Sequence, residues 1–346
     1  MKEIVYFYPE GHEQHRQAGH PERPERVEAI SSALDEFGFW QPYPKTEPVR
    51  IPENILHAIH NSEYLVRLQE ICRQGLHFDA DTYTTPESWR LALNSAGGAI
   101  SVATAVWRRE AKRGFALTRP PGHHATSNRA MGFCLLNNVA LAAEALIQAE
   151  GAKRVAIIDL DLHHGNGTQD IFFTRSDVVY FSTHQYPHYP GTGWLDETGL
   201  GAGELCTVNF PLPPFSGDRE FFTVMDEIFL PLLERFEPDI LLISYGFDPH
   251  FDDPLGSLQL TSGGYGIIIR RLVDWADEHC DGRIAMFLEG GYDLRAAKAC
   301  TGAVVAALLG DTFPDRYDQA IQPAERIDSA VFISILENAR RIWEVS

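Results

Sequence analysis

Residues 159 to 167 read DLDLHHGNG and follow directly on the apolar run VAII. In an extended segment, residues two apart point the same way, so Asp161 and His163 can converge on one ion while the intervening leucines pack behind them. Asp248, in the later cluster GFDPH, offers a third ligand. One neutral imidazole with two carboxylates suits Zn²⁺, and three protein ligands leave room for water and substrate. The sequence therefore predicts a catalytic metal site.

The identity of this metal stays open at the level of residue types. A mixed nitrogen and oxygen ligand set does not exclude Fe²⁺, Mn²⁺ or Co²⁺. The alternative reading of the trio is an ordinary salt-bridge network without a metal. Buried charges that lack a compensating cation are costly, so we favour the metal, and Zn²⁺ in particular.

Two adjacent histidines, His123 and His124, lie on the turn RPPGHH. Such a pair suits proton transfer, since one ring can take a proton from water and the pair can then supply one to a leaving group. Asp159 and Asn166 are natural partners for the other ring nitrogens. A surface dipeptide is the alternative, and only the neighbouring polar clusters argue against it.

Tyr292 follows two glycines in the cluster EGGYDL. The glycines allow an unusual backbone, so the phenol can approach the far side of the ion. There it can hydrogen-bond the oxyanion of a tetrahedral intermediate, the step at which such donors contribute most. A tyrosine packed in the core is the alternative reading.

These clusters need elements that bring them together. Short β-branched runs alternate with stretches of helical periodicity, which is typical of a parallel sheet covered on both faces. All four polar clusters follow a predicted strand at its carboxyl end, where open α/β sheets bind ligands. The strand candidates are residues 3–8, 114–118, 154–160, 178–183, 239–244 and 284–290; the helix candidates are 24–38, 88–110, 137–151, 218–237 and 264–279.

Length and composition limit the fold class, the number of domains and the location of the protein. The chain has 346 residues, 44% of them apolar, and no Gly/Ser-rich linker or repeat, so we predict an α/β fold in a single domain over residues 1–346. The longest predicted loops are residues 184–204 and 246–262. The N-terminus lacks a signal-like pattern and no segment has about 18 uninterrupted apolar residues, so we expect a cytoplasmic protein without membrane contact.

Charge and cysteines narrow the possible partners. A net charge of −19 opposes nucleic-acid binding and favours cationic ligands such as lysine-bearing peptides and polyamines, although the same acidity can simply keep a protein soluble. The five cysteines are scattered and include no CxxC pair. We therefore expect reduced, buried thiols and neither a disulfide framework nor a thiolate zinc site.

Taken in order, the motifs RPPGHH, GFC, DLDLHHGNGTQDIF, YPGTG, GFD, DPLG and LEGGYDL resemble those of the zinc-dependent histone deacetylase family, which includes class II-like bacterial deacetylases and acetylpolyamine amidohydrolases. The match runs from GHPERPERVEAI near the start to the helix expected after Tyr292. The resemblance implies an arginase/deacetylase-like three-layer α/β fold. A central parallel sheet of about eight strands would lie between helices, with one zinc at the bottom of a narrow tunnel.

The resemblance also implies roles by position. Asp161, His163 and Asp248 would hold zinc, with His124 as the general base and His123 as its neighbour in the tandem pair. Tyr292 would polarise the amide carbonyl together with zinc, so that water attacks and acetate is released. The implied tunnel walls are Phe133 and Tyr189, the latter where many members have a second phenylalanine, and the Gly132 carbonyl would accept the substrate N–H.

The resemblance further implies structural potassium. One ion near zinc would be held by Asp159, Ser182, Thr183 and the backbones of Asp161 and His163. A second site would involve Phe172 and Val178.

Three rival readings remain distinguishable. Arginase-like enzymes need two further carboxylates, and those positions are Gly165 and Gly246, so a ureohydrolase is disfavoured. A non-enzymatic acyl-lysine binding module would be expected to lack a metal ligand or Tyr292, and none is missing. An acetylpolyamine amidohydrolase would use every catalytic residue named above.

The tunnel mouth separates the last rival from an acyl-lysine deacetylase. The apparent gatekeeper position holds Leu255 and not the glutamate that some polyamine-selective relatives carry, and the N-terminal third looks too compact for a dimerising insertion. We therefore expect removal of acetyl or other short acyl groups from the ε-amine of lysine, with acetylated polyamines as the alternative substrates. Asp81 is a candidate rim residue for a peptide backbone, or else a turn or cap residue.

Overall fold

A single parallel sheet runs through the centre of the computed structural model, which describes residues 1–314, 317 and 329–345. The strand order is β1-β2-β7-β6-β3-β4-β5, and every neighbouring pair is parallel. The strands are β1 (Lys2–Phe7), β2 (Ala111–Ala116), β3 (Val155–Asp159), β4 (Val178–Gln185), β5 (Thr207–Leu212), β6 (Ile240–Tyr245) and β7 (Ile284–Leu288). The predicted α/β class with a parallel sheet is confirmed.

The sheet has seven strands among the described residues, where the resemblance implies about eight. Six of them fall on the strand candidates of the sequence. The seventh, β5, was missed because its run TVNFPL contains asparagine and proline, which are depleted in strands. Proline is tolerated there because β5 is the edge strand, and its outer side needs no ladder hydrogen bond.

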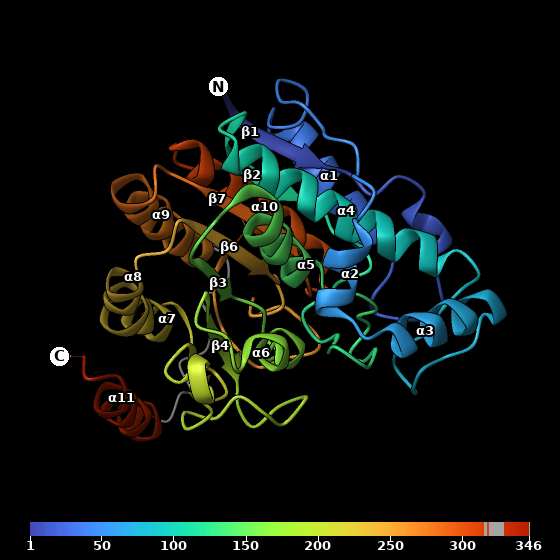
Figure 1. Ribbon diagram of the computed structural model, residues 1–346. Coiled ribbons are helices and arrows are strands. Elements are labelled where there is room, and N and C mark those ends of the chain that lie inside the picture. Colours follow the sequence, from blue (N-terminus) through green and yellow to red (C-terminus); the bar gives the residue numbers. More distant parts are fainter. Residues whose placement is uncertain (315–316, 318–328, 346) are drawn as a thin grey trace.

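Helices cover both faces of the sheet (Figure 1). The α-helices are α1 (Glu25–Glu36), α2 (Glu53–Ile59), α3 (Ser62–Gln74), α4 (Ser88–Trp107), α5 (Asn138–Ala145), α6 (Asn166–Phe172), α7 (Asp218–Val224), α8 (Leu230–Phe236), α9 (Ser262–His279), α10 (Leu294–Leu309) and α11 (Ser329–Trp343). The described part of the chain also contains two 3₁₀-helices, η1 (His12–Gln14) and η3 (Gly201–Gly203), and two short π-helices, η2 (Leu146–Glu150) and η4 (Met225–Phe229).

The core lies in two apolar layers, one on each face. Ile158 of β3 and Ile243 of β6 point into the layer shared with α1 and α7 to α11, whereas the adjacent Ile157 and Leu242 point into the layer shared with α2 to α6. This alternation is the period-two geometry of strands, and it explains why β3, β6 and β7 are buried along their whole length.

The sequence located some of the helices and missed others. All five predicted helices are present, although residues 137–151 are divided into α5 and η2, and residues 218–237 into α7, η4 and α8. The helices α2, α3, α6 and α11 were not among the candidates, and α10 was expected only as the helix after Tyr292. Of the two predicted loops, 184–204 contains only the end of β4 and the short η3, and 246–262 continues to the start of α9.

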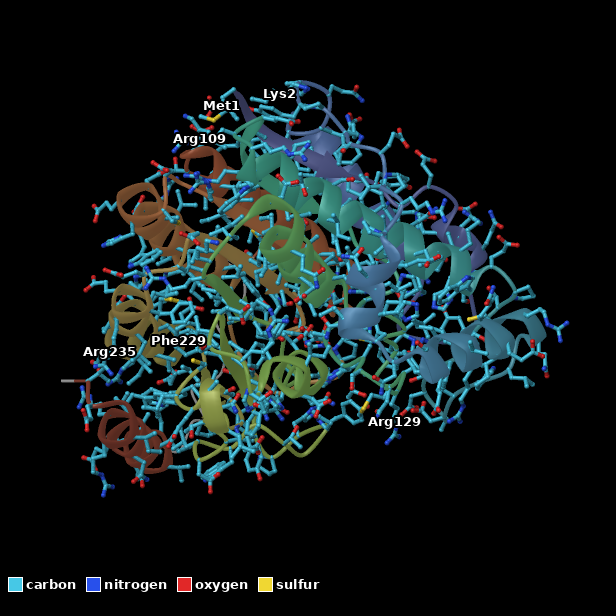
Figure 2. All side chains as sticks on the ribbon, in the orientation of Figure 1. Met1, Lys2, Arg109, Arg129, Phe229 and Arg235 are labelled. Atoms are coloured by element: carbon cyan, nitrogen blue, oxygen red, sulfur yellow. The ribbon has the colours of Figure 1, made fainter. Side chains whose placement is uncertain are left out.

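Charged side chains lie mainly at the periphery. Figure 2 shows Lys2, Arg109 and Arg235 at the outline of the molecule, whereas Phe229 is fully buried. None of the helices in the described part of the chain combines the length and the apolar character needed to cross a bilayer. All five cysteines are free, and four of them are buried.

Candidate active site

The polar clusters meet at the carboxyl edge of the sheet because their strands are parallel neighbours. β3 and β6 pair in register, with Asp159 opposite Ser244, so the segments that follow both strands leave the sheet side by side. Asp161 and His163 lie just beyond β3, and Asp248 lies just beyond β6. Leu160 and Leu162 pack into the core behind them, as the alternation in the sequence predicts.

Asp161, His163 and Asp248 converge on one point. The Nδ1 atom of His163 lies 3.1 Å from Asp161 Oδ1 and 3.1 Å from Asp248 Oδ2. One potential ligand atom from each residue lies within 4.8 Å of the other two, and all three residues are buried. The three residues that the sequence predicts as ligands are therefore brought together.

The electrostatics of this cluster fit a cation. Burial, reinforced by the Asp161 charge, raises the pKa of Asp248 to about 7. Burial lowers the pKa of His163, but the two carboxylates outweigh it and raise that pKa to about 9. Two buried carboxylates thus share one imidazole, and without a metal they draw a proton onto it. A divalent cation is the natural partner for such a site.

Glycines leave the room that the carboxylates need. A Cβ atom on Gly246 would collide with the Asp161 and Asp248 carboxylates, and one on Gly290 would collide with the same pair. The backbone N–H of Gly290 also donates to Asp161 Oδ2 at 2.7 Å. The arginase-like reading needs a carboxylate at position 246, and the packing there has no space for one.

His123 and His124 lie beside this cluster with their rings 4.0 Å apart. His123 Nδ1 is 3.1 Å from Asp159 Oδ2, and His124 Nδ1 is 2.8 Å from Asn166 Oδ1. Because the other amide atom of Asn166 donates to Met131 Sδ, its oxygen faces His124, whose Nδ1 must carry the proton. The Nε2 lone pair of His124 is therefore left for a substrate or water.

The two rings differ in charge. Burial lowers the pKa of His123, but the Asp161 and Asp159 carboxylates outweigh it and raise that pKa to about 10. Burial, together with the charges of His123 and His163, lowers the pKa of His124 well below its ordinary value. The pair therefore combines a cationic ring with a neutral one, which suits an acid and a base acting side by side.

A cavity of about 320 Å³ leads from the surface to these groups. Most of the residues that the sequence predicts for catalysis and substrate binding line this cavity. Three further lining residues were not predicted. The cavity is lined by His20, Pro21, Asp81, His124, Gly132, Phe133, His163, His188, Tyr189, Leu255 and Tyr292.

Aromatic rings shape the cavity. Phe133 lies edge-on to Tyr292 at 5.9 Å, and Tyr189 lies edge-on to His124 at 5.1 Å. Tyr292 is 8% exposed, and within the described residues its hydroxyl makes no hydrogen bond, so it is free to donate to a bound group. Asp81 lies at the rim, where its backbone N–H bonds the side chain of Asp79 and its carbonyl faces His20.

Reasoning from the sequence missed His20, Pro21 and His188. The ring of His20 lies 4.7 Å from that of Phe133, and the ring of His188 lies 5.1 Å from that of His163. His188 adjoins Tyr189 in the motif HYPGTG, so its proximity to a predicted wall residue was the available signal. For His20, only tertiary structure brings the N-terminal segment to the tunnel.

Glu289 was also missed, although it opens the quoted motif EGGYDL. This buried carboxylate accepts from the backbone N–H groups of Gly122 at 2.7 Å and His123 at 3.1 Å. Burial raises the pKa of Glu289 to about 7. A charged residue directly after the apolar strand IAMFL was the signal that could have found it.

Several of the residues predicted to bind potassium already make hydrogen bonds to other side chains. Asp159 Oδ2 contacts His123 and accepts from Tyr180, and Ser182 Oγ lies 2.9 Å from His184 Nδ1. Thr183 Oγ1, by contrast, is buried and has no hydrogen-bond partner among the described residues. Phe172 and Val178 lie at the end of α6 and the start of β4. Both potassium sites stay predictions.

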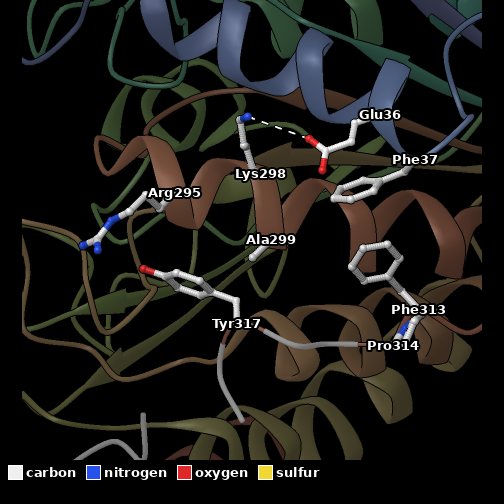
Figure 3. Close-up of a pocket in the computed structure, with 8 residues that line it drawn as sticks. All are labelled: Glu36, Phe37, Arg295, Lys298, Ala299, Phe313, Pro314 and Tyr317. Carbon is white, nitrogen blue, oxygen red and sulfur yellow. Dashed lines mark ion pairs between the residues drawn. The ribbon is translucent and has the colours of Figure 1, made fainter. Parts of the chain in front are cut away.

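A larger cavity, of about 630 Å³, is lined by the end of α1, by α10 and by Phe313, Pro314 and Tyr317 (Figure 3). Its lining is mainly apolar. Of its three charged residues, Lys298 pairs with Glu36 at 3.9 Å, and Arg295 lies 3.6 Å from Asp293. Neither of the two groups of potential metal ligands found among the described residues lies in this cavity.

Fold and site together define an α/β enzyme-like protein with its reactive groups at the carboxyl edge of a parallel sheet. Residues 20–308 match the histone deacetylase domain model. The chain belongs to the histone deacetylase family and is a hydrolase of that family.

Relatives span most of the chain. A probable deacetylase of Archaeoglobus fulgidus is 41% identical over 309 residues, covering 88% of this chain and 86% of the relative. A histone deacetylase-like amidohydrolase of Pseudomonas aeruginosa is 37% identical over 296 residues, and the match covers 85% of this chain and 78% of the relative. The crystal structure of the HDA15 HD domain superposes with a TM-score of 0.86 at 35% identity, covering 99% of this chain and 97% of that one.

Proposed function

We propose that this protein is a zinc-dependent amidohydrolase that removes acetyl or other short acyl groups from the ε-amine of lysine in proteins or peptides. One observation carries the proposal. The buried cluster of Asp161, His163 and Asp248 lies beside a narrow cavity that His163, His124 and Tyr292 all line. Zn²⁺ bound by the cluster would supply Lewis acidity, which activates water and polarises an acyl carbonyl.

The chain's own residues supply the remaining steps of the proposed reaction. His124 is neutral and presents an unprotonated Nε2, so it can take a proton from the attacking water. His123 carries a positive charge held by Asp159, so it can help return a proton to the leaving amine. Tyr292 has a free hydroxyl that can donate to the oxyanion formed on the substrate carbonyl.

Substrate shape follows from the cavity walls. A lysine side chain is a narrow alkyl stem, and the rings of Phe133 and Tyr189 with the side chain of Leu255 offer it an apolar channel. Among the described residues, the Gly132 carbonyl accepts a hydrogen bond only from the weak thiol donor of Cys134, at 3.3 Å. It therefore retains a lone pair for a substrate N–H.

The test compares substrates on zinc-loaded protein. An acetyl-lysine peptide, acetylputrescine, acetylspermidine and acetylcadaverine are each incubated with the protein, and the freed amine and acetate are quantified. We expect the highest kcat/KM on the peptide, loss of activity on chelation and its return with Zn²⁺. Hydrolysis of none of the four by zinc-loaded protein would refute the proposal.

A higher kcat/KM on the acetylated amines would support the alternative, an acetylpolyamine amidohydrolase. The acidic surface favours such cationic substrates through its net charge of −19. Cytoplasmic placement stays a prediction, and the names of two plant relatives include the word chloroplastic.

A further inference from the structure

The segment that carries Tyr292 has little stiffness of its own. Gly290 and Gly291 precede it, and Gly291 has φ +107°, a conformation that side chains with a Cβ rarely adopt. A Cβ on Gly291 would also meet the ring of Phe247. The place of the Tyr292 hydroxyl must therefore be set by contacts from outside the segment.

One such contact comes from Asp253, a buried carboxylate outside the predicted catalytic set. Asp253 is 5% exposed, and its Oδ2 atom accepts from the backbone N–H of Tyr292 at 2.6 Å and from that of Asp293 at 3.3 Å. Hydrogen bonds from N–H groups to an ionised carboxylate are about twice as strong as neutral ones. The anchor acts on the residue that bears the phenol.

The same carboxylate also holds a second residue of the cavity wall. Asp253 Oδ1 accepts from the backbone N–H of Leu255 at 3.0 Å, and Leu255 lines the tunnel. An ordinary turn residue would make only this local bond. Asp253 also reaches across 39 residues of sequence to Tyr292, so one side chain joins two walls of the substrate cavity.

Arg26, a cation, also holds the segment that carries Tyr292. Its guanidinium donates to the carbonyl oxygens of Gly291 and Glu289 and lies 5.0 Å from the centroid of the Tyr292 ring. The carbonyl groups of the segment thus face a cation, while its N–H groups at Tyr292 and Asp293 face an anion. Loss of either charge would leave buried backbone groups without partners.

We propose that Asp253 is a positioning residue of this active site, whose carboxylate sets the place of the Tyr292 hydroxyl and ties it to the Leu255 wall. The inference rests on the proposed function for its kinetic consequence, but its structural consequence is independent of any substrate. Asp253 touches no reacting atom. It acts through Tyr292.

The experiment uses Asp253→Asn in the zinc-loaded full-length protein. The amide keeps the size of the side chain but offers one acceptor atom in place of two, so it cannot hold Leu255 and Tyr292 together. We expect kcat on the acetyl-lysine peptide to fall roughly 10- to 100-fold, since displacement of a catalytic group by about 1 Å costs up to that factor. We expect KM to change less than about threefold and zinc content to stay stoichiometric.

A double-mutant cycle separates positioning from a general structural role. If Asp253 acts through Tyr292, Asp253→Asn adds less than about a threefold loss to Tyr292→Phe. Losses that multiply would overturn the inference. The matched control is Asp252→Asn, because Asp252 is the adjacent carboxylate and contacts Tyr317 instead of the cavity walls. It is expected to leave kcat unchanged.

Crystal structures of the zinc-loaded wild type and Asp253→Asn give the readout that needs no activity. We expect the Tyr292 hydroxyl to shift by about 1 Å or to lose its density, with Asp161, His163 and Asp248 in place. A Tyr292 hydroxyl that keeps its position in Asp253→Asn would overturn the inference. If the wild type hydrolyses none of the tested amides, that result refutes only the proposed function, and the structural comparison still tests the inference. If Asp253→Asn does not fold, Asp253→Glu, which displaces the acceptor atoms by one methylene, is measured by the same criteria.

Discussion

Two groups of buried charges lie close together in this protein and are built in opposite ways. In the first, Glu22 is fully buried and pairs with two guanidinium groups, Arg119 at 2.7 Å and Arg26 at 3.2 Å. In the second, two carboxylates, Asp161 and Asp248, share one imidazole. The first group brings its own cations, whereas the second has a deficit of positive charge.

The protonation of the two groups reflects this difference. Burial raises the pKa of Glu22, but Arg119 and Arg26 outweigh it and hold that pKa at about 2. Burial raises the pKa of Asp248 to about 7, because the nearby Asp161 adds to the effect. A buried charge that the protein itself neutralises serves the fold, and one that the protein leaves short of a partner is reserved for a ligand.

The two groups meet at Tyr292. Arg26 belongs to the first group, yet it donates to the carbonyls of Glu289 and Gly291 beside the second. The ion-pair group of Glu22 therefore also helps to hold the backbone beside the candidate metal site. Substitutions in the two groups should separate metal binding, catalysis and stability.

The largest effect is expected from Asp248→Ala, which removes one of the two carboxylates of the cluster. We expect loss of stoichiometric zinc and of measurable hydrolysis, because the remaining aspartate and histidine cannot hold a divalent ion firmly. Metal analysis by mass spectrometry provides the measurement. Asp252→Ala is the control, and a zinc content equal to that of the wild type in Asp248→Ala would contradict the ligand assignment.

Tyr292→Phe should separate catalysis from metal binding. The hydroxyl is the only group removed, and loss of one oxyanion donor lowers kcat by about 10²- to 10³-fold. Zinc content should stay unchanged. Steady-state kinetics on the acetyl-lysine peptide make the test, with Tyr186→Phe, a phenol outside the cavity, as the control. Turnover near that of the wild type would remove the oxyanion role from Tyr292.

Glu22→Gln tests the self-balanced group. The substitution removes the negative charge of Glu22 and leaves the buried Arg119 and Arg26 without a carboxylate partner. Removal of one partner of a buried ion pair costs about 3–5 kcal/mol of unfolding free energy. Urea unfolding of the metal-free protein measures the change, so that metal binding does not contribute. An unchanged unfolding midpoint would show that the network does not stabilise the fold.

Arg73→Ala is the counterpart at the surface and the smallest expected effect. Arg73 pairs with Glu70 at 2.7 Å, but the two side chains are 70% and 50% exposed, so water replaces the interaction readily. We expect an unfolding midpoint equal to that of the wild type in the same urea experiment. A clear loss of stability would mean that burial is not what separates the two kinds of ion pair.

Much of the site was predictable because its ingredients lie next to strands. Asp161, His163 and Asp248 follow apolar runs that are unmistakable as buried strands, and parallel strands bring their carboxyl ends to one edge. Asp253 carried no such signal, since its contact with Tyr292 spans 39 positions of sequence. His20 reaches Phe133 from a different part of the chain, and no periodic pattern records that approach.

The sequence by itself determined the alternation of strands and helices, the polar clusters at the strand ends and the types of ligand, because these follow from local periodicity and side-chain chemistry. Only the tertiary structure decided that β5 closes the sheet as its edge, that Glu22 is neutralised by Arg119 from a segment 97 residues away, and that Asp253 joins the two walls of the cavity. Such contacts depend on how distant segments pack against each other, and that packing leaves no local pattern in the chain.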